Sequence, residues 1–176
     1  MKLYVARHGQ TVWNAENRVC GISNIDLTPK GIEQANELAK IVANENVDII
    51  LTSPLNRAVD TGKIVSAYCN IPMYIEDRLI EQNYGIYEGV DRKNPDFLAN
   101  KRNFAYRYPK GESMMQTAYR VYGLLEDIKE KYAGKNVLFI SHGGVCRIIN
   151  TYFKDMTNDE FFNYTLKNAC LEEYEL

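Results

Sequence analysis

The stretch Leu3-Tyr4-Val5-Ala6-Arg7-His8-Gly9-Gln10-Thr11 has a counterpart much later in the chain, Val137-Leu138-Phe139-Ile140-Ser141-His142-Gly143-Gly144-Val145. Each is an apolar run that leads into His-Gly, and these are the only two histidines of the sequence. A short apolar run closed by a polar residue and glycine is typical of a buried strand that ends in a tight loop. Because open α/β sheets build their sites at strand carboxyl ends, we predict that both imidazoles face one pocket.

The composition sets the class of protein. The 176 residues fit one domain, residues 1–176, and their net charge of −2 favours neither nucleic acid nor membrane as a partner. No apolar run approaches the roughly 20 residues of a spanning helix, and the chain enters its first strand without room for a signal peptide. Cys20, Cys69, Cys146 and Cys170 show no C-x-x-C spacing. We therefore expect a cytoplasmic protein with reduced thiols, no bound metal and no cofactor.

Strand and helix patterns alternate along most of the chain. Thr28-Pro29 and Ser53-Pro54 each read as an N-cap followed by proline, so a helix is expected after each pair. The expected strands are residues 2–7, 47–52, 71–75, 136–141 and 169–174, and the other expected helices are 114–132, 145–153 and 158–164. This rhythm predicts an α/β fold, a three-layer α/β/α sandwich with a mostly parallel central sheet and one antiparallel edge strand. The final edge strand offers a pairing surface and leaves a homodimer open.

The rhythm breaks over residues 77–111, which are rich in glycine, asparagine, proline and tyrosine. We interpret this segment as a lid or insertion beside the sheet, with a short helix over residues 96–104; the alternative is a solvated loop. Its tyrosines either stack on a substrate ring or pack the lid. Its basic residues either form a solvated face or bind a second anionic group of a substrate; they include Arg92, Lys93, Lys101, Arg102 and Arg107.

Two arginines point to an anionic ligand. Arg7 ends a buried strand with no acidic residue nearby before Glu16, and a buried guanidinium needs a negative partner. Arg57 falls in the first turn of its helix, where a cation opposes the helix dipole unless an anion is bound. Guanidinium groups bind phosphate oxygens bidentately, so the residues favour a phosphate site with a histidine nucleophile. Glu81, after an apolar pair and before a Tyr-Gly turn, is the candidate general acid.

These residues fall in a set of motifs. Arg7-His8-Gly9-x-Thr11 followed by Trp13-Asn14 resembles the signature of the histidine phosphatase superfamily, which includes cofactor-dependent phosphoglycerate mutases and related phosphatases. Five further motifs resemble the family pattern in the same order and extend the likeness over nearly the whole chain: Leu27-Thr28-x-x-Gly31, Ser53-x-x-x-Arg57-Ala58-x-x-Thr61, Glu81-x-x-Tyr84-Gly85-x-x-x-Gly89, Gly111-Glu112-Ser113 and His142-Gly143-x-x-x-Arg147.

The resemblance implies a role for each matching residue. His8 would accept the phosphoryl group as phosphohistidine, and Glu81 would act as acid for the leaving group and then as base for water. Arg7, Arg57 and His142 would hold the phosphoryl oxygens. The residues expected to contact substrate are Asn14, Thr11, Gln10, Ser23, Tyr84, Arg92 and, through its backbone N–H, Gly143. No metal is expected, because the Arg and His charges neutralise the phosphoryl group.

This sequence departs from the family pattern at two places. We expect both to lie near the entrance of the site, so the substrate preference stays open. Gly21-Ile22-Ser23-Asn24 stands where Gly-Trp-x-Asp is common, and Gly62 replaces a common alanine. The expected function is a metal-independent phosphomonoesterase acting on a small metabolite, with a sugar phosphate, phosphoserine or a nucleotide-loop precursor of cobalamin among the candidates. The alternatives are a phosphoglycerate mutase, which in this family has a longer lid that excludes water, and a non-catalytic binder of phosphorylated ligands.

Overall fold

A five-stranded sheet forms the centre of the molecule, with the strand order β3-β2-β4-β1-β5. The structure is a computed structural model that describes residues 1–176. The strands are β1 (Lys2–Arg7), β2 (Ile49–Thr52), β3 (Met73–Ile75), β4 (Val137–Ser141) and β5 (Leu171–Glu175). Strands β1 to β4 run parallel, and β5 pairs antiparallel with β1 at one edge. The predicted α/β fold with one antiparallel edge strand is confirmed.

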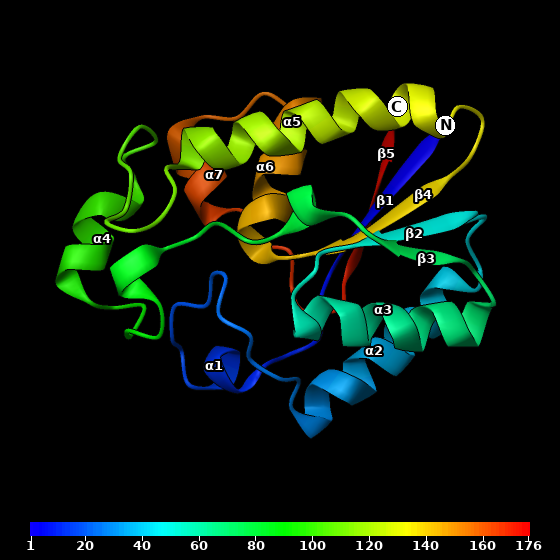
Figure 1. Cartoon of the computed structure of the whole chain (residues 1–176), viewed down its shortest axis with the longest axis horizontal. Coiled ribbons are helices and arrows are strands. Elements are labelled where there is room, and N and C mark those ends of the chain that lie inside the picture. Colours follow the sequence, from blue (N-terminus) through cyan, green and yellow to red (C-terminus); the bar gives the residue numbers. More distant parts are fainter.

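Alternate side chains of each strand enter two separate cores. In β1, Leu3 and Val5 pack on the side of α5 (Met114–Lys131) and α6 (Gly143–Phe153). Tyr4 and Ala6 pack on the opposite side, against α2 (Pro29–Val42) and α3 (Asn56–Cys69). Figure 1 shows these helix layers above and below the sheet, with the short α7 (Asn158–Asn163) beside α6. A sheet buried on both faces explains why its strands read as nearly continuous apolar runs.

The start of α3 differs from the prediction. Thr28 caps α2 as expected, because its hydroxyl accepts a hydrogen bond from the N–H of Gly31 at 3.0 Å. Ser53 does not cap α3, which begins at Asn56 after an N-cap, Leu55, that makes no side-chain capping bond. The Ser53 hydroxyl instead lies 2.7 Å from Nε2 of His142. The Ser53 hydroxyl, which the local sequence pattern predicts to cap the helix, therefore contacts a histidine that is distant in the sequence.

Within the segment from residue 77 to residue 111, the part from about residue 84 onward forms a lobe with its own small core (Figure 1, left), whereas Leu79 belongs to the main core beside α5. The segment contains the 3₁₀ turns η1 (Asp77–Leu79) and η2 (Gly85–Tyr87) and the helix α4 (Pro95–Lys101), which is shorter than expected. Phe97 and Tyr108 are buried there with Val19 of the loop that follows β1, and four partly buried residues pack around them: Tyr84, Tyr87, Val90 and Tyr106. Burial raises the pKa of Tyr108 to about 12. The alternative of a solvated loop is wrong, because this aromatic cluster packs the lobe.

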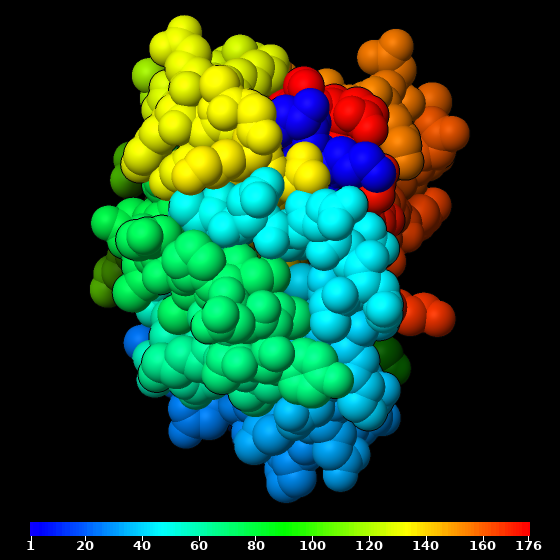
Figure 2. All heavy atoms as spheres, turned by 90° about the vertical axis from the view of Figure 1, so that its right-hand side faces the viewer, coloured from blue at the N-terminus to red at the C-terminus, as the bar shows by residue number.

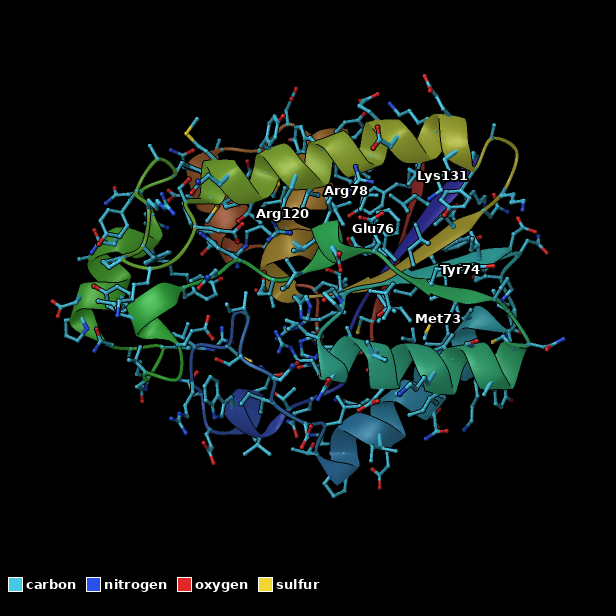
Figure 3. The ribbon with its side chains drawn as sticks, in the orientation of Figure 1. Met73, Tyr74, Glu76, Arg78, Arg120 and Lys131 are labelled. Carbon is cyan, nitrogen blue, oxygen red and sulfur yellow. The ribbon has the colours of Figure 1, made fainter.

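Gly62 lies away from the site entrance, contrary to the sequence-based expectation. It is on α3, and a Cβ added there would lie 2.7 Å from Sδ of Met73 on β3. Figure 3 shows Met73 on the side of the sheet that faces α3. The absence of a side chain therefore allows close packing of helix against sheet, and the residue has no place in substrate preference.

The end of the molecule opposite the lobe holds the beginnings of the parallel strands. Figure 2 shows the N-terminal residues packed between the residues that precede β4 and those of β5. The N–H of Leu176 donates to the carbonyl of Met1 at 2.9 Å. All four cysteines are unpaired. None of the helices combines the length and the apolar character that crossing a membrane requires.

Candidate active site

The two histidines lie side by side because their strands are neighbours. The register of β1 and β4 pairs Arg7 with Ser141, so the residue that follows each strand is a histidine at the same edge. The ring centroids of His8 and His142 are 5.0 Å apart. The rings lie side by side, but the prediction that both face one pocket is wrong for His142, which is fully buried and does not line the cavity described below.

The protonation state of His8 follows from its two hydrogen bonds. Its Nδ1 lies 2.6 Å from the carbonyl oxygen of Gly9, a group that only accepts, so Nδ1 carries the proton. Its Nε2 then accepts a hydrogen bond from Nε of Arg57 at 3.2 Å. Burial and then the charges of Arg57 and Arg7 hold the pKa of His8 well below its ordinary value. The imidazole is therefore neutral at pH 7, with Nε2 free of a proton.

Arg57 holds both imidazoles with one N–H group. Its Nε also lies 3.2 Å from Nδ1 of His142, and its terminal nitrogens donate to the carbonyls of Ser23 at 2.8 Å and Gly21 at 2.6 Å. Burial lowers the pKa of this guanidinium from its ordinary value, although it stays charged. Each of its three nitrogens donates to a protein group and the residue does not line the cavity, so Arg57 positions the histidines from outside the cavity wall.

Glu88 of the lobe fixes the loop on which Arg57 depends. Its carboxylate accepts hydrogen bonds from the N–H groups of Gly21 at 3.1 Å, Ile22 at 3.1 Å and Ser23 at 3.3 Å, and from the Ser23 hydroxyl at 2.8 Å. The carbonyls of Gly21 and Ser23, in turn, receive the guanidinium of Arg57. The lobe therefore helps to place both histidines through this loop.

A cavity of about 100 Å³ opens beside His8. Its walls come from the loop after β1, the lobe and the start of α6, and they include Arg7, His8, Asn14, Val19, Cys20, Glu81, Tyr84, Arg92, Phe97, Lys101, Gly143, Gly144, Arg147 and Thr165. Nε of Arg7 is buried and has no hydrogen-bond partner. An unsatisfied buried donor costs free energy, and the Arg7 side chain that carries it lines the cavity, so the wall includes a guanidinium able to bind an anion.

Glu81 lies at the N-terminus of α6. One carboxylate oxygen accepts from the N–H of Gly144 at 2.9 Å and the other from its neighbour Gln82 at 2.9 Å. A negative group is favoured at this helix end. A Cβ on Gly144 would lie 2.5 Å from the carboxylate, so only glycine permits this close approach. Glu81 therefore faces the same cavity as His8 with its side chain held in place.

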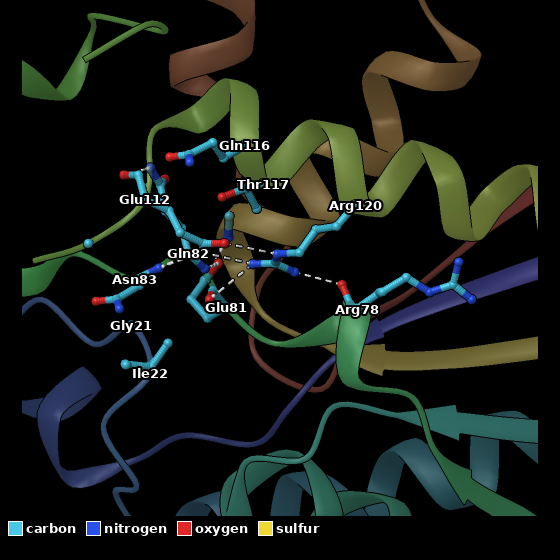
Figure 4. Close-up of polar contacts among 12 residues, drawn as sticks. Gly21, Ile22, Arg78, Glu81, Gln82, Asn83, Glu112, Gln116, Thr117 and Arg120 are labelled. Atoms are coloured by element: carbon cyan, nitrogen blue, oxygen red, sulfur yellow. Dashed lines mark hydrogen bonds and ion pairs between the residues drawn. The ribbon is translucent and has the colours of Figure 1, made fainter. Parts of the chain in front are cut away.

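Arg120 of α5 holds the segment that carries Glu81 (Figure 4). Its Nη1 donates to the carbonyl of Arg78 at 2.6 Å and its Nη2 to the carbonyl of Glu81 at 3.2 Å. The same guanidinium forms an ion pair with Glu112 at 3.2 Å, and the Glu112 carboxylate accepts from the N–H of Asn83 at 3.0 Å. The backbone around Glu81 is thus tied to α5 on both sides of the candidate acid.

The structure brings seven of the predicted site residues to this cavity: Arg7, His8, Asn14, Glu81, Tyr84, Arg92 and Gly143. Five others do not line it. Thr11 is fully buried and caps α1 (Val12–Ala15), and Gln10 bonds to Gln34 and Thr28 of the neighbouring loop and helix. Ser23, Arg57 and His142 form the supporting layer described above. Local sequence motifs alone do not distinguish residues that line the cavity from residues that support the cavity-lining side chains.

Several residues of the site were not assigned from the sequence. Lys101 stood among the basic residues of the lid and Arg147 in the last family motif, so both carried a signal. Asn168 carried none: its amide donates to the carbonyl of His8 at 2.9 Å and to Oδ1 of Asn14 at 3.3 Å across 160 and 154 positions. The other unassigned wall residues are Val19, Cys20, Phe97, Gly144 and Thr165.

Comparison with known proteins gives consistent matches. The model of the histidine phosphatase superfamily (branch 1) matches residues 3–176. The probable phosphoglycerate mutase GpmB of Yersinia pestis (strain Pestoides F) is 35% identical over 150 residues, which are 81% of this chain and 70% of that protein. Bacillus stearothermophilus YhfR superposes with a TM-score of 0.89 at 30% identity, over 99% of this chain and 91% of that one. The alpha-ribazole phosphatase of Shigella flexneri shares the fold, with a TM-score of 0.88 at 24% identity over 100% of this chain and 91% of that one.

Proposed function

Because the chain belongs to the histidine phosphatase superfamily, branch 1, we propose that it hydrolyses a small phosphomonoester by way of a phosphohistidine on His8. The observation that carries the proposal is the state of His8, a neutral imidazole with an unprotonated Nε2, in a side chain that lines a cavity rich in arginine. An unprotonated ring nitrogen is what attack on phosphorus requires. The unpaired cysteines fit action in the cytoplasm.

The first step moves the phosphoryl group to the protein. Nε2 of His8 attacks phosphorus, the bond from phosphorus to the ester oxygen breaks, and the carboxyl of Glu81 gives its proton to the leaving alkoxide. The N–H of Arg7 Nε that lacks a partner supports contact with a phosphoryl oxygen. The amide nitrogen of Asn14 is available for a second contact, because Oδ1 already accepts from Thr11 and Asn168.

The second step returns His8 to its starting state. The Glu81 carboxylate removes a proton from water as the water oxygen attacks phosphorus and the P–N bond breaks. The products are the alcohol and inorganic phosphate, and Nε2 of His8 is again free. His142, with Nδ1 accepting from Arg57, supports this cycle by holding the guanidinium in line with His8.

A phosphoglycerate mutase is the second candidate, favoured by the 35% identity to the probable mutase GpmB. A mutase would use the same two residues but pass the phosphoryl group from His8 to a hydroxyl of a bound monophosphoglycerate, forming a bisphosphoglycerate, in place of water. Phosphate release from a panel of phosphomonoesters with chelator present tests the first candidate. Interconversion of 3-phosphoglycerate and 2-phosphoglycerate with added 2,3-bisphosphoglycerate, without phosphate release, would favour the second.

His8→Ala is expected to abolish phosphate release and to prevent trapping of an acid-labile phosphoryl group on the protein, while the far-UV circular dichroism stays native. His142→Ala serves as the comparison, since it removes the other imidazole and retains the nucleophile; a trapped phosphohistidine should still form, at lower yield. Turnover by His8→Ala at the wild-type rate would overturn the proposed mechanism. No phosphate release or interconversion with any ester would leave the chain a binder of phosphorylated ligands.

A further inference from the structure

The connection between α7 and β5, residues 164–170, lies against the end of the strand that leads to the nucleophile. The side chain of Leu166 is buried in the main core, and its backbone carbonyl accepts a hydrogen bond from Nη1 of Arg7 at 3.1 Å. Two residues before β5 begins, the N–H of Ala169 donates to the carbonyl of Arg7 at 2.9 Å. This one connection therefore holds both the backbone and the guanidinium of Arg7.

The side chain of Asn168 extends this hydrogen bonding one residue further along the chain, to His8. Its Nδ2 donates to the carbonyl of His8 at 2.9 Å and to Oδ1 of Asn14 at 3.3 Å. Asn168 does not line the cavity, whereas His8 and Asn14 both do. Asn168 therefore contacts two residues of the candidate phosphate site from outside the cavity, and it can affect a ligand there only through them.

The orientation of the Asn168 amide is fixed by the group that it faces. A backbone carbonyl only accepts hydrogen bonds, so the nitrogen of Asn168, and not its oxygen, lies against His8. The same nitrogen donates to Asn14, which requires that Oδ1 of Asn14 faces it. The N–H of Thr11 also donates to this oxygen, at 3.1 Å. Because both lone pairs of Oδ1 are in use, Nδ2 is the group of the Asn14 side chain that is available to a phosphoryl oxygen.

The backbone beside Asn168 has a conformation that a residue with a side chain rarely adopts. Ala169 has a φ of 54°, in the left-handed region, and is buried. A Cβ disfavours this region, so such a residue persists where surrounding contacts require it, and these residues cluster at functional sites. The N–H of Ala169 is bonded to Arg7, while the preceding side chain, that of Asn168, is directed at His8. The fold therefore accepts local strain at the turn that positions Asn168.

We propose that Asn168 is a positioning residue, which keeps the Asn14 amide turned so that its Nδ2 binds the phosphoryl group transferred to His8. This inference rests on the proposed function and adds to it a residue that lies outside the cavity. The contact with the His8 carbonyl sets the direction of the Asn168 amide, and the contact with Oδ1 sets that of the Asn14 amide in turn.

Asn168→Asp reverses the hydrogen bonding and preserves the shape of the side chain. A carboxylate presents only acceptors, so it repels Oδ1 of Asn14 and attracts its Nδ2, and a charged acceptor forms the stronger hydrogen bond. We expect the Asn14 amide to turn over and its nitrogen to leave the phosphoryl group. kcat/KM for p-nitrophenyl phosphate should fall about tenfold or more, the effect of losing one hydrogen bond to a charged group. Asn168→Ala, which removes the donor without adding a charge, should lower it less.

A double-variant cycle with Asn14→Ala separates positioning from a general structural role. Since residues in contact are not additive, Asn168→Asp should lower kcat/KM about tenfold in the wild-type background and no more than about twofold in the Asn14→Ala background. A role in stability alone would give equal factors in both backgrounds. The affinity for inorganic phosphate, measured by calorimetry, should follow the same pattern as kcat/KM.

Asn163→Asp is the matched control for Asn168→Asp. It makes the same chemical change at an exposed asparagine, the last residue of α7, which does not line the cavity. Its kcat/KM and its affinity for phosphate should equal those of the wild type. A loss as large as that of Asn168→Asp would assign the effect to the added charge and would overturn the proposal.

The failure of this proposal and the failure of the proposed function give different results. Hydrolysis of p-nitrophenyl phosphate that Asn168→Asp and Asn168→Ala both retain at the wild-type rate would overturn the positioning role and leave the phosphatase standing, as would additive losses in the cycle. Should Asn168→Asp lose its native far-UV circular dichroism, Asn168→Ala takes its place in the cycle. Where no ester is hydrolysed, phosphate binding still tests the role: an unchanged affinity in Asn168→Asp, or no binding by the wild-type protein, would overturn it.

Discussion

A single buried N–H group sets the state of both histidines. His8 donates from Nδ1 to a carbonyl, so its Nε2 must accept. Nδ1 of His142 faces the Nε–H of Arg57, which can only donate, so this nitrogen also accepts and the Nε2–H of His142 donates to the Ser53 hydroxyl at 2.7 Å. Nε of Arg57 lies 3.2 Å from each accepting nitrogen. The geometry keeps both rings neutral, because protonation of either would place a second positive charge against the guanidinium. At the scale of one residue, Arg57 therefore keeps Nε2 of His8 free of a proton.

Glu81→Gln tests the acid role at the same scale. Gln cannot donate a carboxyl proton, so kcat/KM for alkyl phosphates, which have poor leaving groups, should fall about 10²- to 10⁴-fold. p-Nitrophenyl phosphate needs little protonation of its leaving group and should be affected much less. The ratio of the two rates is the readout and is insensitive to the amount of folded protein. An equal loss on both esters would contradict the role of Glu81 as acid.

The residues proposed to carry the chemistry stand in local sequence motifs, whereas most of the residues that hold them do not. His8 and Glu81 stand beside glycine-containing turns within short motifs, so local pattern was enough. Ser53 was misassigned because its partner, His142, is 89 positions away. Asn168 and Glu88 act through backbone groups 160 and 67 positions distant, and no local spacing indicates such contacts.

At the scale of elements, the start of α5 and the segment Arg78 to Asn83 behave as one unit. Arg120 reaches across from α5 to two carbonyls of that segment, and Glu112 at the helix start accepts from its Asn83 N–H. The strand and helix bounds predicted from periodicity and capping residues differ from the observed bounds by no more than three residues for most elements. The contacts between α5 and this segment depend on tertiary geometry and were therefore beyond sequence pattern.

Arg120→Met should act through Glu81. Without the two Arg120 hydrogen bonds to the backbone, the Glu81 carboxyl is less well positioned. We therefore expect kcat/KM for alkyl phosphates to fall about tenfold or more, and kcat/KM for p-nitrophenyl phosphate to fall less. Arg120→Met combined with Glu81→Gln should be no slower on alkyl esters than Glu81→Gln alone, because contacting residues are not additive. Arg120→Lys should recover part of the loss.

Arg78→Gln is the matched control for Arg120→Met. Its side chain pairs with Glu76 and Asp127 on the outer surface, and only its backbone carbonyl receives Arg120 (Figures 3 and 4). Its leaving-group dependence should match that of the wild type. Additive losses in the double variant of Arg120 and Glu81 would show that Arg120 affects activity by some route other than Glu81.

At the scale of the whole molecule, burial of two neutral histidines makes stability depend on pH. The pKa of each is held well below 6.5 in the folded protein, first by burial and then by the charge of Arg57. As the pH falls below 6.5, the unfolded chain binds protons that the folded protein does not, which favours unfolding. The histidine contribution to stability is therefore complete above pH 6.5 and is lost as the pH falls towards the lowered values.

Urea unfolding between pH 7.5 and pH 5 measures this effect. The unfolding free energy should fall by up to about 1.4 kcal/mol per pH unit for each histidine below pH 6.5, and carboxylates ordinarily titrate below this window. His8→Gln removes one of the two groups and should about halve the slope. A free energy that stays flat from pH 7 to pH 5 would contradict the neutral state of both rings.

The position of β1 in the sheet has a consequence for biosynthesis. Its two neighbours, β4 and β5, are made from residues 137–141 and 171–175, so β1 is synthesised well before either of them. Arg7 and His8 therefore have no strand beside them until translation has passed Ser141, and β1 remains an open apolar edge until then. A nascent chain halted before that point holds the nucleophile without Arg57's second partner, His142, and presents an unpaired strand that favours aggregation or chaperone binding.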